Sequence, residues 1–298
     1  MVFLKRLFAP VAALLALASP TVASAKAPQT AHPALWELSD QDTTIYLFGT
    51  IHLLPDNYQW RSPKLDQAVS GSQQLIVETI IDQKDPTRLM SVLAGMAYAK
   101  GLPPLSERVP AAKRDALAKA VKESGIPPAF LDQMKTWAAA FMLLGNQYRQ
   151  MGLKGTDGVE SILRENFTGA GKPIGELETN ADQLGFFDKL PEAAQRALLE
   201  GSIEASDDTT KEFQGMLKAW SKGDVEAIAR SFDQELSGSP ELKEALLRHR
   251  NANWSKWIEQ RMAQPGTIII AVGAGHLAGP DSVISLLKKD GYRVRRVQ

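Results

Sequence analysis

The sequence predicts an α+β protein in which strands from both ends of the chain form one mixed sheet around a large helical insertion. Short apolar and β-branched runs lie close to the two ends, whereas the middle of the chain has mainly helical patterns and no solenoid repeat. Such segregation of strands and helices is typical of α+β folds. The predicted terminal strands are residues 34–38, 44–49, 74–78, 267–272 and 292–297.

The first predicted elements are strands with one short helix between them. Residues 34–38 and 44–49 are joined by Ser39-Asp40-Gln41-Asp42, which is typical of a hairpin. Ser62 to Val69 predicts a short helix with Pro63 in its first turn. Gln74 to Glu78 predicts a buried strand that ends in a carboxylate.

The helical middle begins with a helix predicted over Phe130 to Arg149, because large apolar residues recur there at steps of three and four, the period of a helical core face. The segment Gly155 to Gly158 opens another helix, with Thr156 or Asp157 as its N-cap. Lys172 to Leu177 predicts a strand within this region, and Asn180 caps the next helix.

The last third of the chain is helical and then returns to the sheet. Pro191 to Met262 predicts helices with breaks near Asp207, Gly223 and residues 237–240. The β-branched run Thr267 to Val272 predicts a strand, which is followed by a helix over Asp281 to Lys289 and a closing strand over 292–297.

Composition excludes several classes of protein. The chain has 34 Lys+Arg and 34 Asp+Glu, so it lacks the basic footprint of a nucleic-acid-binding protein. With 44% hydrophobic residues it is not a disordered chain. It has no cysteine, which excludes disulfides, thiolate metal sites, iron–sulfur clusters and a cysteine nucleophile.

The N-terminus predicts export. Lys5 and Arg6 precede an apolar stretch over residues 7–17, and Ala23-Ser24-Ala25 has the small-x-small pattern of a cleavage site. We therefore expect a signal peptide over 1–25, a flexible leader over 26–33 and a single domain over 34–298. The stretch is too short to span a bilayer, so the mature protein has no membrane span and is expected in the periplasm, with secretion or a retained N-terminal anchor as alternatives.

Two segments far apart in the sequence share one pattern, a strand followed by Gly-x-x-His-Leu. Gly49 precedes His52 in the first, and Gly273 precedes His276 in the second. Each histidine therefore follows the C-terminal end of a buried strand, where α/β proteins gather ligands. Glu78 ends a third strand and can complete the site, although a strand-end salt bridge would also explain it. Two imidazoles and a carboxylate form a familiar ligand set for Zn, Mn, Fe or Co.

These motifs resemble the TraB/PrgY/GumN family, especially its bacterial GumN-like branch, and its Tiki metalloprotease relatives. The resemblance rests on F-G-T-I-H-L-L-P, A-V-G-A-G-H-L-A-G and R-N-x-x-W, and it spans Leu35 to Val297. It implies a fold related to the erythromycin-esterase and ChaN-like group, with His52, His276 and Glu78 around one cleft. It also implies a divalent-metal-dependent peptidase, commonly associated with Mn or Co. Glu160, Glu178, Arg250 and Asn251 form a second group of candidate catalytic residues.

The leading functional hypothesis is therefore a hydrolase of peptide or small-molecule substrates that uses a metal-activated water. One alternative is a binding protein for haem, metal or another ligand, because the ChaN-like relatives are associated with haem or iron. Another is an accessory factor in exopolysaccharide or surface assembly. Two further histidines, His32 in the leader and His249 beside Arg250, lie outside both motifs and receive no role.

Overall fold

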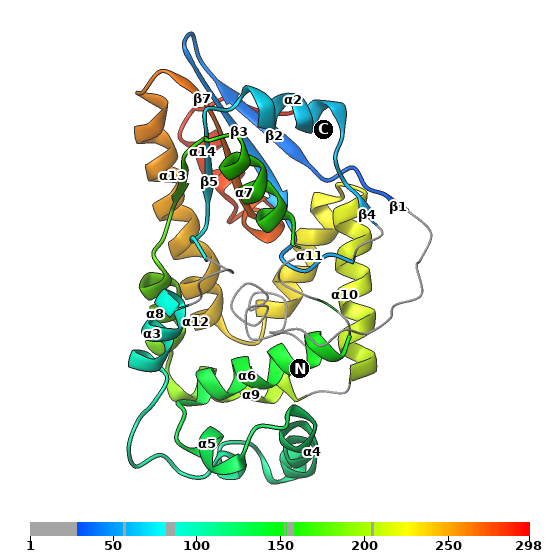
Figure 1. Cartoon of the computed structure of the whole chain (residues 1–298), viewed down its shortest axis with the longest axis vertical. Helices are drawn as coiled ribbons and strands as arrows, with labels where there is room; N and C mark the ends of the chain where they lie inside the picture. Colours follow the sequence, from blue (N-terminus) through cyan, green and yellow to red (C-terminus); the bar gives the residue numbers. More distant parts are fainter. Residues whose placement is uncertain (1–28, 56–57, 82–86, 152, 154–157, 204–205) are drawn as a thin grey trace.

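A computed structural model describes residues 29–298 except 56–57, 82–86, 152, 154–157 and 204–205 (Figure 1). The predicted signal peptide and the two predicted N-caps Thr156 and Asp157 lie outside the described residues. Within the described ranges, no helix combines the length and the apolar character that a membrane crossing requires.

The predicted α+β architecture is confirmed. A mixed sheet of six strands has the order β6-β5-β7-β3-β2-β8, so strands from the two ends of the chain are neighbours within it. The strands are β2 (Leu35–Ser39), β3 (Thr43–Thr50), β5 (Gln74–Val77), β6 (Ile174–Glu176), β7 (Gly266–Gly273) and β8 (Val294–Arg296). The pairs β6–β5, β5–β7 and β7–β3 are parallel, and β2 is antiparallel to both β3 and β8, which confirms the predicted hairpin.

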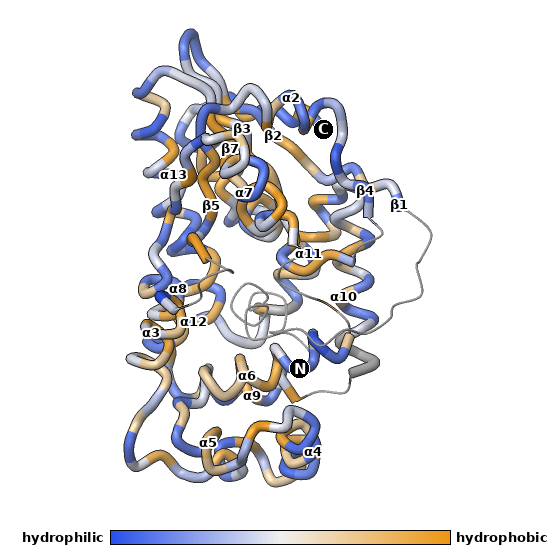
Figure 2. The backbone as a smooth tube through the Cα atoms, in the orientation of Figure 1, coloured by the Kyte–Doolittle hydropathy of each residue, from blue (hydrophilic) through white to orange (hydrophobic). Residues whose placement is uncertain are grey.

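The central strand β7 is apolar on both faces because helices cover the sheet on both sides (Figures 1 and 2). Ile268 and Ile270 pack with α13 (His249–Met262) and α14 (Val283–Lys289). Ile269 and Ala271 face the opposite way, in the core that contains residues of α2 (Pro63–Gly71) and α7 (Val159–Gly169). This alternation follows from the two-residue period of a strand.

The helical insertion has a separate apolar core built around Trp137, Phe141 and Leu144 of α6, which belong to the predicted core stripe. Figure 1 shows these helices below the sheet, with α4 and α5 farthest from it. The helices between β5 and β7, besides α7 and α13, are α3 (Thr87–Met96), α4 (Arg114–Ser124), α5 (Pro128–Asp132), α6 (Thr136–Gln150), α8 (Asn180–Asp188), α9 (Glu192–Ser202), α10 (Ser206–Ser221), α11 (Val225–Leu236) and α12 (Pro240–Lys243). Single turns occur at η1 (Leu105–Glu107), η2 (Ala111–Lys113), η4 (Glu244–Arg248) and, after β7, η5 (Ala274–Leu277).

The prediction of one helix over Phe130 to Arg149 is wrong, because the chain forms α5 and α6 with a break between them. The break is extended at Lys135, whose N–H donates to the Ala97 carbonyl, while Met134 forms a β-bridge with Tyr98. Phe130 lies in the helix before the break, α5, and its side chain is 41% exposed. Tertiary pairing of the backbone thus overrides a continuous helical pattern.

Two other local predictions differ slightly from the structure. Thr179, and not Asn180, is the N-cap of α8, because its hydroxyl accepts from the Asp182 N–H in a capping box. Asn180 is the first helical residue, and its amide contacts Thr79 and the Ile80 carbonyl instead. The break predicted near Asp207 is present but lies slightly earlier, between Ser202, the last residue of α9, and Ser206, the first residue of α10.

The described part of the predicted flexible leader is folded against the domain. Strand β1 (Gln29–Thr30) pairs in parallel with β4 (Tyr58–Gln59). The Ala31 N–H donates to the Gln59 carbonyl, and the side chain of Ala31 is buried. Polar composition alone predicted flexibility, whereas backbone pairing and one buried alanine hold these residues.

Candidate functional site

The site is built at the C-terminal ends of β5, β7 and β3, which are neighbouring parallel strands. Glu78 follows β5 directly, His276 lies in η5 after β7, and His52 follows β3. Because parallel strands end at the same edge of a sheet, the topology brings together three residues that are up to 224 positions apart (276 − 52 = 224).

His52 is held by Glu160 at the start of α7. Its Nδ1 lies 2.7 Å from Glu160 Oε1, and the Thr50 hydroxyl donates to the same carboxylate oxygen. Burial lowers the pKa of His52, but the carboxylates of Glu160 and Glu78 outweigh it and raise the pKa above its usual value. Among the described residues, no hydrogen-bond partner faces His52 Nε2.

The loop that carries His52 packs against the backbone of Gly158. A Cβ at this glycine would lie 2.2 Å from the His52 carbonyl oxygen, closer than van der Waals contact allows. We expect Gly158→Ala to displace this loop and to lower the free energy of unfolding by about 1–3 kcal/mol, as overpacking does. Denaturant titration measures the loss.

Gly169 supplies the matched control for this substitution, because it ends the same helix and a Cβ there would meet nothing within 4 Å. Gly169→Ala should leave the stability unchanged or slightly raised. Equal unfolding free energies for the two variants would contradict the proposed contact at Gly158.

Glu78 is a buried carboxylate whose two oxygens face different partners. Oε1 accepts from the Gly273 N–H at 2.7 Å, and Oε2 accepts from Arg250 Nη2 at 2.7 Å. Gln183 Nε2 also lies 3.4 Å from Oε2. Burial raises the pKa of Glu78, but Arg250 and the neighbouring histidines outweigh it and hold the pKa at about 2. Glu78 is therefore ionised at neutral pH.

His276 is a buried, neutral imidazole with a defined tautomer. Its Nε2 lies 3.1 Å from Arg250 Nη1, which can only donate, so Nε2 is the unprotonated nitrogen. Nδ1 then carries the proton and donates to Asn251 Oδ1 at 2.7 Å. Burial and the charge of Arg250 lower the pKa of His276 to about 3. Trp254 covers the ring, with the two ring centroids 4.4 Å apart.

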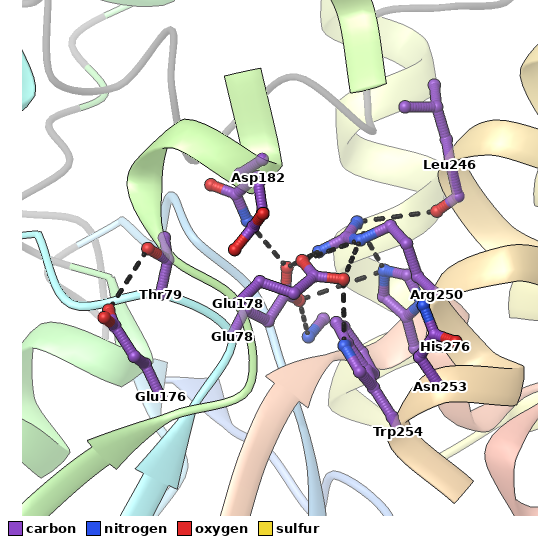
Figure 3. A network of polar contacts seen from close by, with 12 residues as sticks. Glu78, Thr79, Glu176, Glu178, Asp182, Leu246, Arg250, Asn253, Trp254 and His276 are labelled. Atoms are coloured by element: carbon purple, nitrogen blue, oxygen red, sulfur yellow. Dashed lines mark hydrogen bonds and ion pairs between the residues drawn. The ribbon is translucent and has the colours of Figure 1, made fainter. Parts of the chain in front are cut away.

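Arg250 is the centre of this polar network (Figure 3). Its Nε lies 3.0 Å from both oxygens of Glu178, and Trp254 Nε1 donates to Glu178 at 2.9 Å. Burial lowers the pKa of Arg250, but the two carboxylates raise it above its usual value. Arg250 follows η4, a π-helical turn, and such wide turns occur frequently at functional sites.

The structure brings all the predicted site residues into this cluster. They are His52, Glu78, Glu160, Glu178, Arg250, Asn251 and His276. His249 is exposed and contacts Asn253, whereas the His32 N–H donates to the Ser221 carbonyl elsewhere. Two residues to which the sequence assigned no site role also contribute, namely Gln183 and Trp254, the second of which is the tryptophan of the R-N-x-x-W motif. The spacing of Trp254, four residues after Arg250 on one helix face, was the available signal for the second.

The predicted metal donors fit a divalent ion in part. A Cβ at Gly273 would lie 3.4 Å from His52 Nε2 and 3.1 Å from Glu78 Oε1, so both donors border the same space. Nδ1 of His52 contacts a Glu160 oxygen and Nδ1 of His276 contacts the Asn251 side-chain oxygen, and such second contacts are usual for imidazole metal ligands. His276 Nε2, however, binds Arg250 and lies 4.0 Å from Glu78 Oε1. Across the residues that the structure describes, no group of three His, Asp or Glu side chains is arranged to hold a metal.

A family model supports the resemblance that the motifs suggested. The TraB/PrgY/gumN family model matches residues 34–296. The chain belongs to this family. Among TraB/PrgY/gumN relatives, it is 25% identical to the "Uncharacterized protein YbaP" of Escherichia coli (strain K12) over 245 residues, 82% of this chain and 87% of YbaP. YbaP of Shigella flexneri matches to the same extent. No solved structure matches the chain.

Proposed function

We propose that this protein is an exported hydrolase, most concretely a peptidase, that holds a divalent metal with His52 and Glu78. One observation carries the proposal: His52 Nε2 and Glu78 Oε1 border the same space above Gly273. The chain belongs to the TraB/PrgY/gumN family, and the resemblance of this family to the Tiki metalloproteases supports metal-dependent hydrolysis as the reaction class. A bound divalent ion would supply a water molecule whose pKa is lowered to near neutrality.

The surrounding residues orient His52 and keep Glu78 ionised. Glu160 contacts Nδ1 of His52 and thereby directs Nε2 away from itself, toward the space at Gly273. Arg250 keeps Glu78 ionised. Gly273 has no side chain, so the space between the donors stays open, and its N–H fixes Glu78 Oε1. His276 can serve as a further ligand only if Arg250 Nη1 releases its Nε2.

Elemental analysis tests the metal site. We expect protein isolated without a His-tag from the exported fraction to contain about one divalent ion per chain. His52→Ala and Glu78→Gln should each remove the ion, because one of the two available donors is lost. Thermal melts of both variants establish that the loss is not unfolding.

His249→Ala is the matched control, since His249 is an exposed histidine outside the cluster. The control variant should retain the metal. Unchanged metal content in His52→Ala and Glu78→Gln, or no metal in the wild-type protein, would refute the proposed metal site. Iron with a visible haem absorption band would instead make this a haem-binding protein and end the peptidase proposal.

A further inference from the structure

A cavity lies between η1, α4 and α5. Figure 1 shows α4 and α5 at the opposite end of the molecule from the sheet. The volume of the cavity is about 590 Å³, within the range of about 300–1,000 Å³ that small-molecule sites occupy. Leu105, Leu117 and Leu131 line it and are at most 3% exposed. Val121, Ile126 and three prolines extend these apolar walls toward solvent.

Several polar groups of the cavity wall are already bonded within the protein. Asp132 Oδ1 accepts from the Leu105 N–H at 2.7 Å, and the guanidinium of Arg108 lies close to the same residue, with Nη2 donating to the Asp132 carbonyl at 2.6 Å. The Ser106 carbonyl accepts from Arg114 Nε at 3.1 Å. A ligand inside the cavity would therefore meet mainly hydrocarbon.

Two cations lie on the rim. Arg114 and Lys122 both line the cavity from α4, and they are eight residues apart, about 12 Å along the helix axis. Among the described residues, neither the terminal nitrogens of Arg114 nor Lys122 Nζ has a hydrogen-bond or ion-pair partner. An apolar interior below a rim with two cations is complementary to an amphiphile with a hydrocarbon chain and an anionic head, because the one carboxylate of the wall, Asp132, accepts from the Leu105 N–H.

We propose that this cavity binds a free fatty acid, with its alkyl chain against the three leucines and its carboxylate at Lys122 or Arg114. A carboxylate can pair with either cation of the rim, and an unbranched alkyl chain matches the apolar side chains of the wall. This binding is independent of the proposed hydrolytic site, which lies at the edge of the sheet.

Calorimetric titration of the full-length protein with octanoate, decanoate and dodecanoate, each below its micellar concentration, tests the proposal. We expect binding that strengthens by up to about fourfold per added CH2, because each buried CH2 contributes about 0.8 kcal/mol. Dodecanol, which lacks the charge, should bind at least tenfold more weakly than dodecanoate. Absence of binding, or equal affinity for dodecanol, would overturn the proposal.

Paired variants on one helix locate the site. Ala118 lines the cavity and Ala116 does not, and both are exposed residues of α4. Ala118→Trp should fill the cavity and abolish dodecanoate binding, whereas Ala116→Trp should retain it.

A second pair tests the charge on the rim. Lys122→Gln should weaken binding several-fold, whereas Lys119→Gln, which changes a lysine outside the cavity, should not. Equal binding within either pair would refute this location, and retained binding by His52→Ala would separate this site from the hydrolytic one.

Discussion

Arg250→Met is expected to lower the free energy of unfolding by about 3–5 kcal/mol, the range observed when one partner of a buried ion pair is removed. Arg250 is 5% exposed and contacts Glu78 Oε2 at 2.7 Å and Glu178 Oε2 at 2.8 Å. Methionine preserves most of the volume but donates no hydrogen bond. Both carboxylates would then remain buried without their cation. Urea titration at neutral pH measures the loss.

Two further variants test whether the lost stability comes from the carboxylates of Glu78 and Glu178, which Arg250→Met leaves buried without a cation. Arg250→Lys keeps the charge but not the guanidinium geometry that reaches Glu78, Glu178 and His276 together, so it should destabilise less than methionine. Adding Glu78→Gln and Glu178→Gln to Arg250→Met should recover part of the lost stability, because no buried charge is left unpaired. A triple variant less stable than Arg250→Met would contradict this account.

Stability is expected to fall steeply as the pH is lowered from 6.5 toward 3, because His276 must stay neutral in the folded protein. Its pKa is about 3 in the fold and 6.5 in an unfolded chain, so the unfolded state binds the proton first. A depressed folded pKa gives stability that is present above 6.5 and lost below it. At about 1.4 kcal/mol per pH unit, about 3 kcal/mol should be lost by pH 4.5.

Two other groups of the site modify this profile in opposite directions. Glu78 has a folded pKa of about 2 against an ordinary 4.5, so its contribution is lost in the same direction at still lower pH. The pKa of His52 is raised, so its contribution is present below 6.5 and is lost as the pH rises through its folded value.

Urea titrations at pH 8, 6 and 4.5 measure the slope of stability against pH, with His276→Gln as the test variant. Glutamine does not titrate, so this variant should have the flatter profile between pH 6.5 and 4.5, whatever its absolute stability. His52→Gln provides the comparison: it should leave the slope between pH 6.5 and 4.5 unchanged and remove the loss of stability that His52 causes as the pH rises above 6.5. Parallel profiles for wild type and His276→Gln would contradict the assigned role of His276.

The sheet and the residues at its edge could be predicted because they depend on local signals. Apolar runs such as Ile268 to Val272 identify the strands, and the repeated Gly-x-x-His marks where two of them end. Parallel neighbours then bring their C-terminal ends together. The cluster could therefore be predicted once strands from the two ends of the chain were expected to be neighbours in one sheet.

The features that could not be predicted depend on tertiary contacts. The bond between Arg250 and His276 Nε2 removes one predicted metal donor, and nothing in the spacing of these residues indicates it. The break at Lys135 depends on the Ala97 carbonyl, 38 positions away (135 − 97 = 38), while the local pattern remains helical. The capping of α8 by Thr179 was missed because the adjacent Asn180 belongs to a residue type that caps helices more often than threonine does.

The position of β7 in the sheet also determines when the protein can fold during its synthesis. Strand β7 lies between β3 and β5, yet it is made after both of them and after the whole helical insertion. Until residues 266–273 have been synthesised, β3 and β5 have no common neighbour, and both expose apolar faces and unpaired edges. Completion of the sheet therefore waits for almost the full chain, and any product that stops before residue 266 lacks both the central strand and His276. The same strand that completes the sheet assembles the site, so a correctly folded sheet and an assembled site appear in one late step.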